Sequence, residues 1–358
     1  MLKIAVVILI AVLIGGGLVL REIGQSPSAE ELKKYENLPY FKNGEFQSPQ
    51  KVVYDFDNVR NGPAGWLRFA KRSPFAPNFE LPHKKLSRGD FAKAAQGFAL
   101  YWLGHSTGLL ELSGNRILFD PVFGNAAPVP FMVPRYNPAL IKAADLPHID
   151  FVVITHNHYD HLERKTVQQL KNSHFVVPLG VGAALRGWGI KDKNITELGW
   201  GDEFNQNGIK IVAEPAVHYS SRGLGDRSKT LWNSYVIQSS DKNIYWSGDS
   251  GYGVHFEQIG KKYGSFDLAA VEIDGWNTGW PNTHMFPEEV IKAATELQAK
   301  QLLPLHWAVF DLALHPWHES IDMLLEANEN IGIEILTPMM GEKIDAHNLP
   351  TARWWKNK

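Results

Sequence analysis

The chain has 358 residues, of which 44% are hydrophobic and 21% charged; this suits one large folded domain or two of ordinary size and argues against disorder throughout. Its 36 basic and 38 acidic residues nearly balance, so no excess of positive charge points to a nucleic-acid partner. Cysteine is absent, which excludes a disulfide framework, a thiolate metal site and a cysteine nucleophile, and leaves histidine and carboxylate side chains to hold any transition metal.

The N-terminus carries an uncharged apolar run from Ile4 to Leu20. As a helix, this run would be roughly 25 Å long, just short of the roughly 30 Å hydrocarbon core of a bilayer. We expect residues 1–24 to form a membrane anchor or a cleavable signal segment, because the run lacks the polar face of a half-exposed helix. With Lys3 on the cytoplasmic side, the main domain would lie outside the cytoplasm at the inner membrane, or in the periplasm after cleavage.

Residues 25–95 are rich in Pro, Lys and Asn and show little periodicity, so we expect a tether followed by an N-terminal arm that packs on the main domain. Within it, Gly65–Pro82 interleaves aromatic and basic residues. That pattern is compatible with an element at the membrane surface and equally with an arm packed on the main domain. The main domain is expected to span residues 96–358.

From Phe98 onward the pattern predicts strands, first in hairpins and later alternating with helices. The segments FALYWLG, GLLELSGNRILFD and FVVITH are predicted strands, with a hairpin turn at Ser113–Asn115. A second hairpin is expected around Asp241–Asn243, and helices are expected in ERKTVQQLKN, PEEVIKAATELQAK and HESIDMLLEAN. This order predicts an α/β (α+β) fold in which helices flank two mixed sheets, an αββα sandwich, rather than a doubly wound parallel sheet.

Four potential metal ligands follow the apolar strand FVVIT: His156, His158, Asp160 and His161. In an extended segment alternate residues point the same way, so His156 and His158 can converge on one ion. The turn that follows would let Asp160 and His161 face a second ion. Four protein ligands are too many for one tetrahedral ion that keeps an open water position, so the sequence predicts two ions.

Three further candidates end other apolar strands: His218, Asp249 and His306. Each precedes a polar or glycine-containing loop, and the end of a strand is where a β scaffold presents side chains to a cleft. Imidazole and carboxylate suit zinc, with iron or manganese as alternatives. We therefore expect two Zn²⁺ ions as cofactors.

The motif THNHYDH resembles the H-x-H-x-D-H signature of the metallo-β-lactamase fold superfamily. A set of segments across most of residues 98–345 is similar to the N-acyl-phosphatidylethanolamine-hydrolysing phospholipase D family and its bacterial relatives. These segments are YWLGHST, ILFDPVF, THNHYDHL, VPLG, WSGDSGY, FEQIGKKYGSFDLA and PLHW.

This resemblance implies a ligand set and a reaction. His156, His158 and His218 would bind one zinc; Asp160, His161 and His306 would bind the other; Asp249 would bridge both together with a water or hydroxide. The implied reaction is hydrolysis of a phosphodiester in a phospholipid headgroup by this bridging hydroxide, with Asp160, Asp249 and His284 as catalytic residues. Two alternatives stay open: a lactonase or other ester or amide hydrolase with the same metals, and an envelope scaffold with structural metals.

Several residues near the expected site have two interpretations each. His105 could touch substrate or metals, or be structural; Asp120 could orient a ligand imidazole, or be a turn residue. His284 could contact substrate or cap the helix that follows it, whereas His315 and His318 are expected at the cleft edge or surface. Aromatic residues in the same loops could line an entrance for acyl chains or belong to the core: Trp276, Trp280, Trp307, Phe310 and Trp317.

Two acids bear on the kind of substrate that the site can accept. Glu272 and Asp274 lie close to the expected site in the segment EIDGWN. An anionic phospholipid headgroup would be repelled by carboxylates in the cleft, unless they meet an amine or stay behind the ligands. The sequence therefore predicts the chemistry of the centre more firmly than its substrate.

Overall fold

The computed structural model describes residues 15–55, 73–91, 93–129 and 132–356. Most of the proposed anchor and residues 65–72 of the aromatic and basic segment lie outside these ranges. Residues 15–23 are helical. Among the described residues, no helix combines the length and apolarity needed to cross a membrane.

Two seven-stranded mixed sheets form the body of the molecule. The first has the order β16-β3-β4-β5-β6-β7-β8, with bounds Lys343–Asp345, Phe98–Gly104, Thr107–Leu112, Asn115–Phe119, Phe151–Val153, His174–Pro178 and Ile195–Leu198. The second has the order β15-β14-β13-β12-β11-β10-β9, with bounds Glu334–Ile335, Gln301–Leu305, Leu268–Glu272, Asn243–Trp246, Ser234–Gln238, Ile209–Glu214 and Glu203–Gln206.

Each sheet is antiparallel in one half and parallel in the other. Strands β3, β4 and β5 form an antiparallel meander, and β5 to β8 are parallel. The second sheet repeats this plan, with β9 to β12 antiparallel and β12 to β15 parallel. The first hairpin turns at Ser113 and Gly114, which both have positive φ, as a two-residue type I′ turn requires. The expectation of hairpins first and alternating helices later is confirmed.

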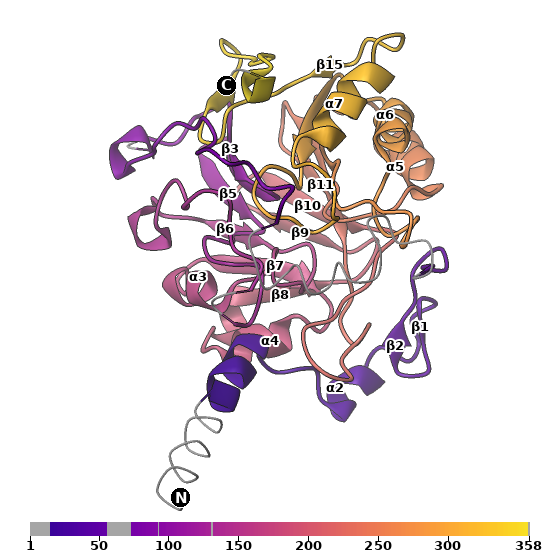
Figure 1. The fold of residues 1–358 in the computed structure, drawn as a ribbon. Coiled ribbons are helices and arrows are strands. Elements are labelled where there is room, and N and C mark those ends of the chain that lie inside the picture. Colours follow the sequence, from indigo (N-terminus) through magenta and orange to yellow (C-terminus); the bar gives the residue numbers. More distant parts are fainter. Residues whose placement is uncertain (1–14, 56–72, 92, 130–131, 357–358) are drawn as a thin grey trace, which may run out of the picture.

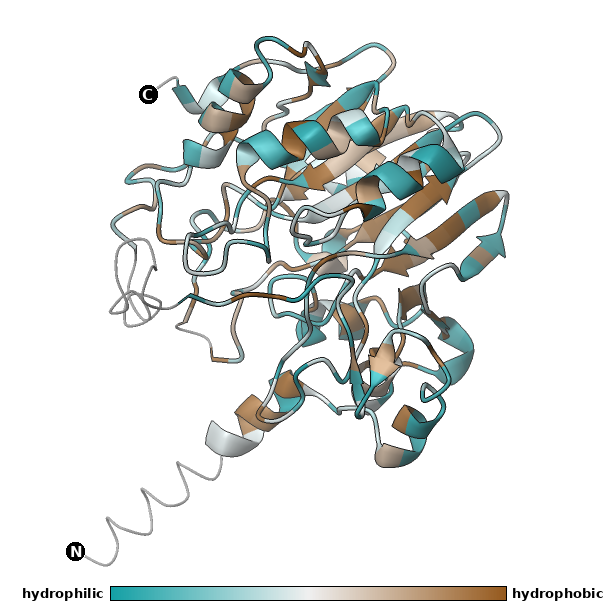
Figure 2. Ribbon diagram, turned by 90° about the vertical axis from the view of Figure 1, so that its right-hand side faces the viewer, coloured by the Kyte–Doolittle hydropathy of each residue, from teal (hydrophilic) through white to brown (hydrophobic). Residues whose placement is uncertain are grey.

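Helices cover the outer faces of the sandwich (Figure 1). Helices α5, α6 and α7 lie together on one side, with α6 in contact with both neighbours and with β13, and α3 and α4 lie near the first sheet. Figure 2 shows apolar residues concentrated on the strands and a mixed surface on these helices. The helix bounds are Ala29–Lys33 (α2), Arg164–Gln169 (α3), Gly182–Gly187 (α4), His255–Tyr263 (α5), Pro287–Glu296 (α6) and Glu319–Ala327 (α7).

Large aromatic side chains fill the space between the two sheets. Phe119 of β5 stacks on Trp246 of β12, with ring centroids 4.1 Å apart. Gly108 of β4 lies against the same indole, so any side chain at that position would collide with it. This interlocking packing fixes the two sheets against each other, and with them the loops that follow their strands. The expected αββα sandwich is confirmed.

The N-terminal residues run along the outside of the sandwich. A short hairpin, β1 (Phe41–Lys42) and β2 (Glu45–Phe46), belongs to a small aromatic cluster that includes Trp232. Farther along, the amide of Asp55 donates to the carbonyl of Gly279 over 2.7 Å. These contacts bring the arm to a loop beside the site described next. The division into anchor, arm and main domain stays a prediction.

Candidate metal centre

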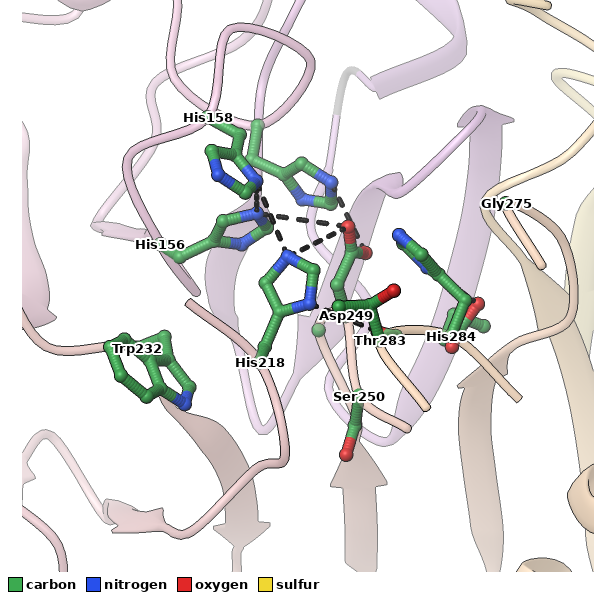
Figure 3. A network of polar contacts seen from close by, with 12 residues as sticks. His156, His158, His218, Trp232, Asp249, Ser250, Gly275, Thr283 and His284 are labelled. Carbon is green, nitrogen blue, oxygen red and sulfur yellow. Dashed lines mark hydrogen bonds and ion pairs between the residues drawn. The ribbon is translucent and has the colours of Figure 1, made fainter. Parts of the chain in front are cut away.

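Four strands each present a candidate ligand one to four residues beyond their end. His156 follows β6, His218 follows β10, Asp249 follows β12 and His306 follows β14. Because the two sheets are packed face to face, these loops meet at one edge of the sandwich. Figure 3 shows imidazoles from separate segments converging on the carboxylate of Asp249.

The first group of donors consists of His156, His158, His218 and Asp249, whose donor atoms all lie within 4.8 Å of one another. The His158 Nδ1 lies 2.8 Å from the His156 Nε2 and 3.3 Å from the His218 Nε2. The Asp249 Oδ2 lies 3.7 Å from the His156 Nε2 and 3.8 Å from the His218 Nε2. Three imidazoles and one carboxylate thus surround a common point.

The second group consists of His105, Asp160, His161 and His306. The Asp160 Oδ2 lies 2.9 Å from the His105 Nε2, 3.3 Å from the His306 Nε2 and 3.4 Å from the His161 Nε2. Asp249 reaches this group as well, because its two oxygens lie 3.1 Å and 3.2 Å from the Nε2 atoms of His306 and His161. Asp249 is therefore shared by the two groups.

The structure brings together all seven residues that the sequence singled out, and it adds His105. Their assignment as ligands of particular ions stays a prediction. His284 lies beside the centre, within 4.8 Å of donor atoms of Asp249 and His306. Figure 3 shows its ring on the opposite side of Asp249 from His158.

Hydrogen bonds on the far side of each ring fix the orientation of several candidate ligands. The Asp120 Oδ2 lies 2.8 Å from the His161 Nδ1, and Thr155 donates both its amide and its hydroxyl to the Asp120 carboxylate. The His218 Nδ1 lies 3.0 Å from the carbonyl oxygen of Thr283. In both rings Nε2 is left facing the centre, as in metal sites whose ligands are oriented by neighbouring acceptors. Asp120 thus orients an imidazole, one of the two roles considered for it.

Three site residues adopt left-handed backbone conformations directly after a strand. The φ angles are +53° at His105, +70° at His306 and +39° at Asp120. Such angles are strained for residues other than glycine and gather at functional sites. The backbone of His306 also donates to the carbonyl of His105 over 3.0 Å, so the two sheets are joined at this point.

Burial and mutual charge divide the imidazoles into two kinds. Burial lowers the pKa of His218 to about 3, and burial together with the neighbouring imidazoles holds the pKa of His156 and His158 well below the usual range. Burial also lowers the pKa of His306, but the carboxylates of Asp249 and Asp160 outweigh it and raise that pKa to about 10. The two carboxylates therefore favour positive charge at His306, whereas burial lowers the pKa of His105 in the same group to about 3.

The donor atoms fit divalent metal ions. Among the described residues, the His161 Nε2, the His306 Nε2 and the Asp249 Oδ1 are buried without a hydrogen-bond partner. A buried polar atom left in this state costs about 1–3 kcal/mol, so several facing one another call for a ligand. Nitrogen and oxygen donors without sulfur suit zinc, iron or manganese. Two groups that share one carboxylate match a pair of ions.

The centre opens into a cavity of about 400 Å³. The side chains around it are polar at the centre and largely aromatic or apolar elsewhere. The lining residues are Tyr54, Ala126, His158, Tyr159, Asp160, His218, Tyr219, Asp249, Gly275, Trp280, Thr283, His284, His306 and Leu312. Of the aromatics considered for an entrance, Trp280 belongs to this lining, whereas Trp307 is 1% exposed and belongs to the core.

The expectation that His315 lies at the cleft edge or surface is wrong. Its ring is buried, stacks on Trp276 with centroids 4.3 Å apart, and places Nε2 3.1 Å from the Asp274 Oδ1. Asp274 also accepts from the hydroxyl of Ser320 over 3.0 Å. His318 is partly exposed and pairs with Asp322. No sequence pattern pointed to Asp274 as the partner of His315, because the two residues come from different loops.

Glu272 and Asp274 are not among the residues that line the cavity. Glu272 is fully buried behind His284, with its Oε2 3.4 Å from the His284 Nδ1 and its Oε1 accepting from the amide of Met285. Burial raises the pKa of Glu272 well above its usual range. Glu272 therefore holds the loop that carries His284, and neither acid lines the wall of the cavity.

Comparison with known proteins shows the family. A model described as a beta-lactamase superfamily domain matches residues 115–307. The chain belongs to the metallo-β-lactamase superfamily. Combined with the His/Asp groups, this makes it a metal-dependent hydrolase of that superfamily.

Relatives of this hydrolase include proteins similar over most of its length. Uncharacterized protein Rv0906 of Mycobacterium tuberculosis is 37% identical over 333 residues, which cover 90% of this chain and 88% of that protein. N-acyl-phosphatidylethanolamine-hydrolyzing phospholipase D 1 of Caenorhabditis elegans is 33% identical over 283 residues, covering 73% of this chain and 79% of the relative. Among solved structures, Igni18, a metallo hydrolase of Ignicoccus hospitalis, matches with a TM-score of 0.55 and 21% identity over 69% of this chain and 97% of its own, which shows the shared fold.

Proposed function

We propose that this hydrolase is a phosphodiesterase of phospholipase D type that cleaves a phospholipid headgroup with two zinc ions. The observation that carries the proposal is its 33% identity, over 73% of the chain, to a relative named for hydrolysis of N-acyl-phosphatidylethanolamine. The paired His/Asp groups and their shared Asp249 supply a fitting centre. Iron or manganese would suit the same donors.

In this proposal Asp249 and the histidines of the first group hold one ion, and Asp160, His161 and His306 hold the other. Two divalent ions would lower the pKa of a shared water from 15.7 to roughly 7 and would stabilise negative charge on the attacked phosphoryl group. Asp249 contacts both groups and therefore fixes the distance between them.

His284 is placed to contact the substrate. It lines the cavity, its ring centroid lies 5.1 Å from that of His306, and Glu272 holds its Nδ1 side. An imidazole fixed in this way can hold or transfer a proton at the substrate oxygen that faces it. The carboxylate of Glu272 faces away from the cavity, so the acids considered at the sequence level do not oppose an anionic headgroup there.

The membrane would supply the substrate. We propose that residues 1–24 anchor the chain at the inner membrane with the hydrolase domain outside the cytoplasm, or serve as a signal segment for the periplasm. Two exposed leucines on the described helix, Leu18 and Leu20, support an apolar setting for this segment, with exposed fractions of 56% and 67%.

Headgroup release from vesicles tests the reaction. Purified full-length protein loaded with zinc would be incubated with phosphatidylethanolamine and N-acyl-phosphatidylethanolamine vesicles and, separately, with lactones. We expect phosphatidic acid from both vesicles, together with ethanolamine from phosphatidylethanolamine and N-acylethanolamine from N-acyl-phosphatidylethanolamine. Lactone turnover without phospholipid turnover would contradict the proposal and favour an ester hydrolase with the same centre.

Two variants make that experiment specific to the centre. Asp249→Asn removes the shared carboxylate, and we expect it to abolish headgroup release. His318→Ala removes a partly exposed histidine whose partner is Asp322, outside the centre, and should leave the rate unchanged. Equal rates for the Asp249 variant and the unaltered protein would show that the activity comes from another site.

A further inference from the structure

Arg222, four residues beyond His218, reaches under the loop that carries most of the candidate ligands. Its side chain is buried, with 8% of the residue exposed. The Nη1 atom donates to the carbonyl oxygens of Asn157 over 2.7 Å and Leu162 over 2.8 Å, with that of His158 at 3.4 Å. One guanidinium nitrogen thus holds the backbone of the metal-binding loop at both of its ends.

The other side of the same guanidinium holds the end of the N-terminal helix. The Nη2 atom donates to the carbonyl of Glu22 over 2.8 Å, and Nε donates to the carbonyl of Ile23 over 3.0 Å. These belong to the last residues of the helix formed by 15–23, whose final carbonyls lack partners within the helix. A cation at this end is also favoured by the helix dipole.

Neighbouring groups keep the guanidinium in this position. It lies 4.0 Å from the ring centroid of Tyr159 and 5.3 Å from that of Trp188, and the Tyr159 hydroxyl donates to the Arg222 carbonyl over 2.7 Å. The Asp226 carboxylate accepts from the backbone amide of Arg222. Burial lowers the pKa of Arg222 to about 10, so it keeps its charge at neutral pH.

We propose that Arg222 is a positioning residue that fixes the metal-binding loop against the end of the N-terminal helix, so that metal affinity depends on this tie. The carbonyls of Asn157 and Leu162 bracket His158, Asp160 and His161 in sequence, and His156 directly precedes Asn157. Ligand atoms must be held within about 0.5 Å of their productive positions. A loop has no neighbouring strand to hold its backbone, so contacts from another segment must fix the positions of its ligands. Arginine suits the role because its planar fork can serve several acceptors at once.

The effect of Arg222 on metal binding does not depend on which substrate the hydrolase cleaves. Arg222 also links the segment proposed to enter the membrane to the centre through one side chain. A second tie between helix and body provides a control, because the Trp188 Nε1 donates to the carbonyl of Arg21 over 2.9 Å. Trp188→Phe removes this hydrogen bond and keeps an aromatic ring beside the Arg222 guanidinium.

The test uses the full-length protein with zinc as the probe. Zinc affinity would be measured by chelator competition for the unaltered chain, Arg222→Ala, Arg222→Lys and Trp188→Phe, together with hydrogen exchange of residues 155–163 in each protein. We expect Arg222→Ala to weaken zinc binding about 10- to 100-fold, as loss of groups that orient ligands does, and to speed exchange in this segment. Arg222→Lys should recover part of the loss, and Trp188→Phe should lower the melting temperature with zinc affinity within about twofold of the unaltered chain.

Two outcomes would overturn the proposal. One is unaltered zinc affinity and loop exchange in Arg222→Ala; the other is equal weakening by Trp188→Phe, which would show that loss of stability alone explains the effect. If circular dichroism shows that Arg222→Ala does not fold, Arg222→Lys decides, because lysine reaches fewer carbonyls and should bind zinc several-fold more weakly. Because zinc binding is measured without substrate, failure of the proposed phospholipid activity would leave this test intact.

Discussion

The hydrolase contains two buried sets of histidine and aspartate that differ in what their donor atoms face. In the metal centre, imidazole nitrogens from four segments converge on the one carboxylate of Asp249, and several of these residues line the cavity. In the second set, His315 pairs with Asp274, which also accepts from Gly275 and Ser320, and the ring stacks on Trp276. The first set opens into the cavity, and the second is closed by its own partners.

This difference separates a ligand-binding centre from a structural ion pair. Both sets combine the same residue types, and both are almost fully buried. A buried pair with its partners in place contributes to the uniqueness of the fold and is costly to break. A set in which several imidazoles crowd around two carboxylates beside a cavity offers donor atoms that a cation can join.

Asp249→Asn should abolish the metal centre. Its carboxylate contacts both groups, so its loss removes the shared negative charge, and we expect activity to fall by about 10³-fold or more. Elemental analysis of the purified variant should find fewer than two ions per chain. Asp274→Asn is the matched control and should retain both. Two ions and full activity in Asp249→Asn would contradict the assignment of this residue to the centre.

His315→Gln should lower the stability of the fold and leave metal binding intact, in contrast to Asp249→Asn. Removing one partner of a buried ion pair leaves Asp274 uncompensated, and we expect the free energy of unfolding to fall by about 3–5 kcal/mol. Urea unfolding measures the loss, and metal content should stay at the level of the unaltered protein. His318→Ala, which breaks a partly exposed pair, should change stability by about 0–1 kcal/mol. Loss of metal from the His315 variant would show that the two sets are not separate.

Asp120→Asn should weaken metal binding without removing a candidate ligand. The Asp120 carboxylate holds His161 from behind, and we expect metal affinity to fall about 10- to 100-fold, because groups behind the ligands orient them. Chelator competition measures the affinity. Asp150→Asn, at a carboxylate that accepts from the amide of Arg116, offers a control with no contact to a ligand ring. Equal metal affinities in Asp120→Asn and Asp150→Asn would show that Asp120 serves only as a turn residue.

The contribution of the His315 pair to stability should depend on pH. Burial lowers the pKa of His315, but Asp274 outweighs it and raises that pKa, and His315 is among the groups that lower the pKa of Asp274. The stabilisation by His315 is therefore complete below its unfolded pKa of about 6.5 and is lost as pH rises through its higher folded pKa. The difference in unfolding free energy between the unaltered chain and His315→Gln should be larger at about pH 5.5 than at about pH 9. A difference that grows with pH would contradict this charge assignment.

Much of the fold followed from local pattern. Apolar runs on either side of the turn at Ser113 and Gly114 identified the first hairpin, and Pro287 with two acids marked the start of α6. Two helices gave weaker signals. Helix α4 is short and contains glycine at both ends, and α5 follows a turn without a side-chain cap, so neither begins with a distinctive residue. The fate of residues 1–24 stays a prediction.

The sequence by itself determined the chemistry of the centre, because His156, His158, Asp160 and His161 follow one strand and their residue types define what they can bind. Only the tertiary structure decided which other groups join them. Asp249 lies far away along the chain, and the packing of the two sheets brings it between both groups. The same packing placed His105 in the second group, turned His315 toward Asp274 and set Arg222 between helix and loop. Such distances depend on how strands from distant segments are stacked, which a local pattern of residues does not specify.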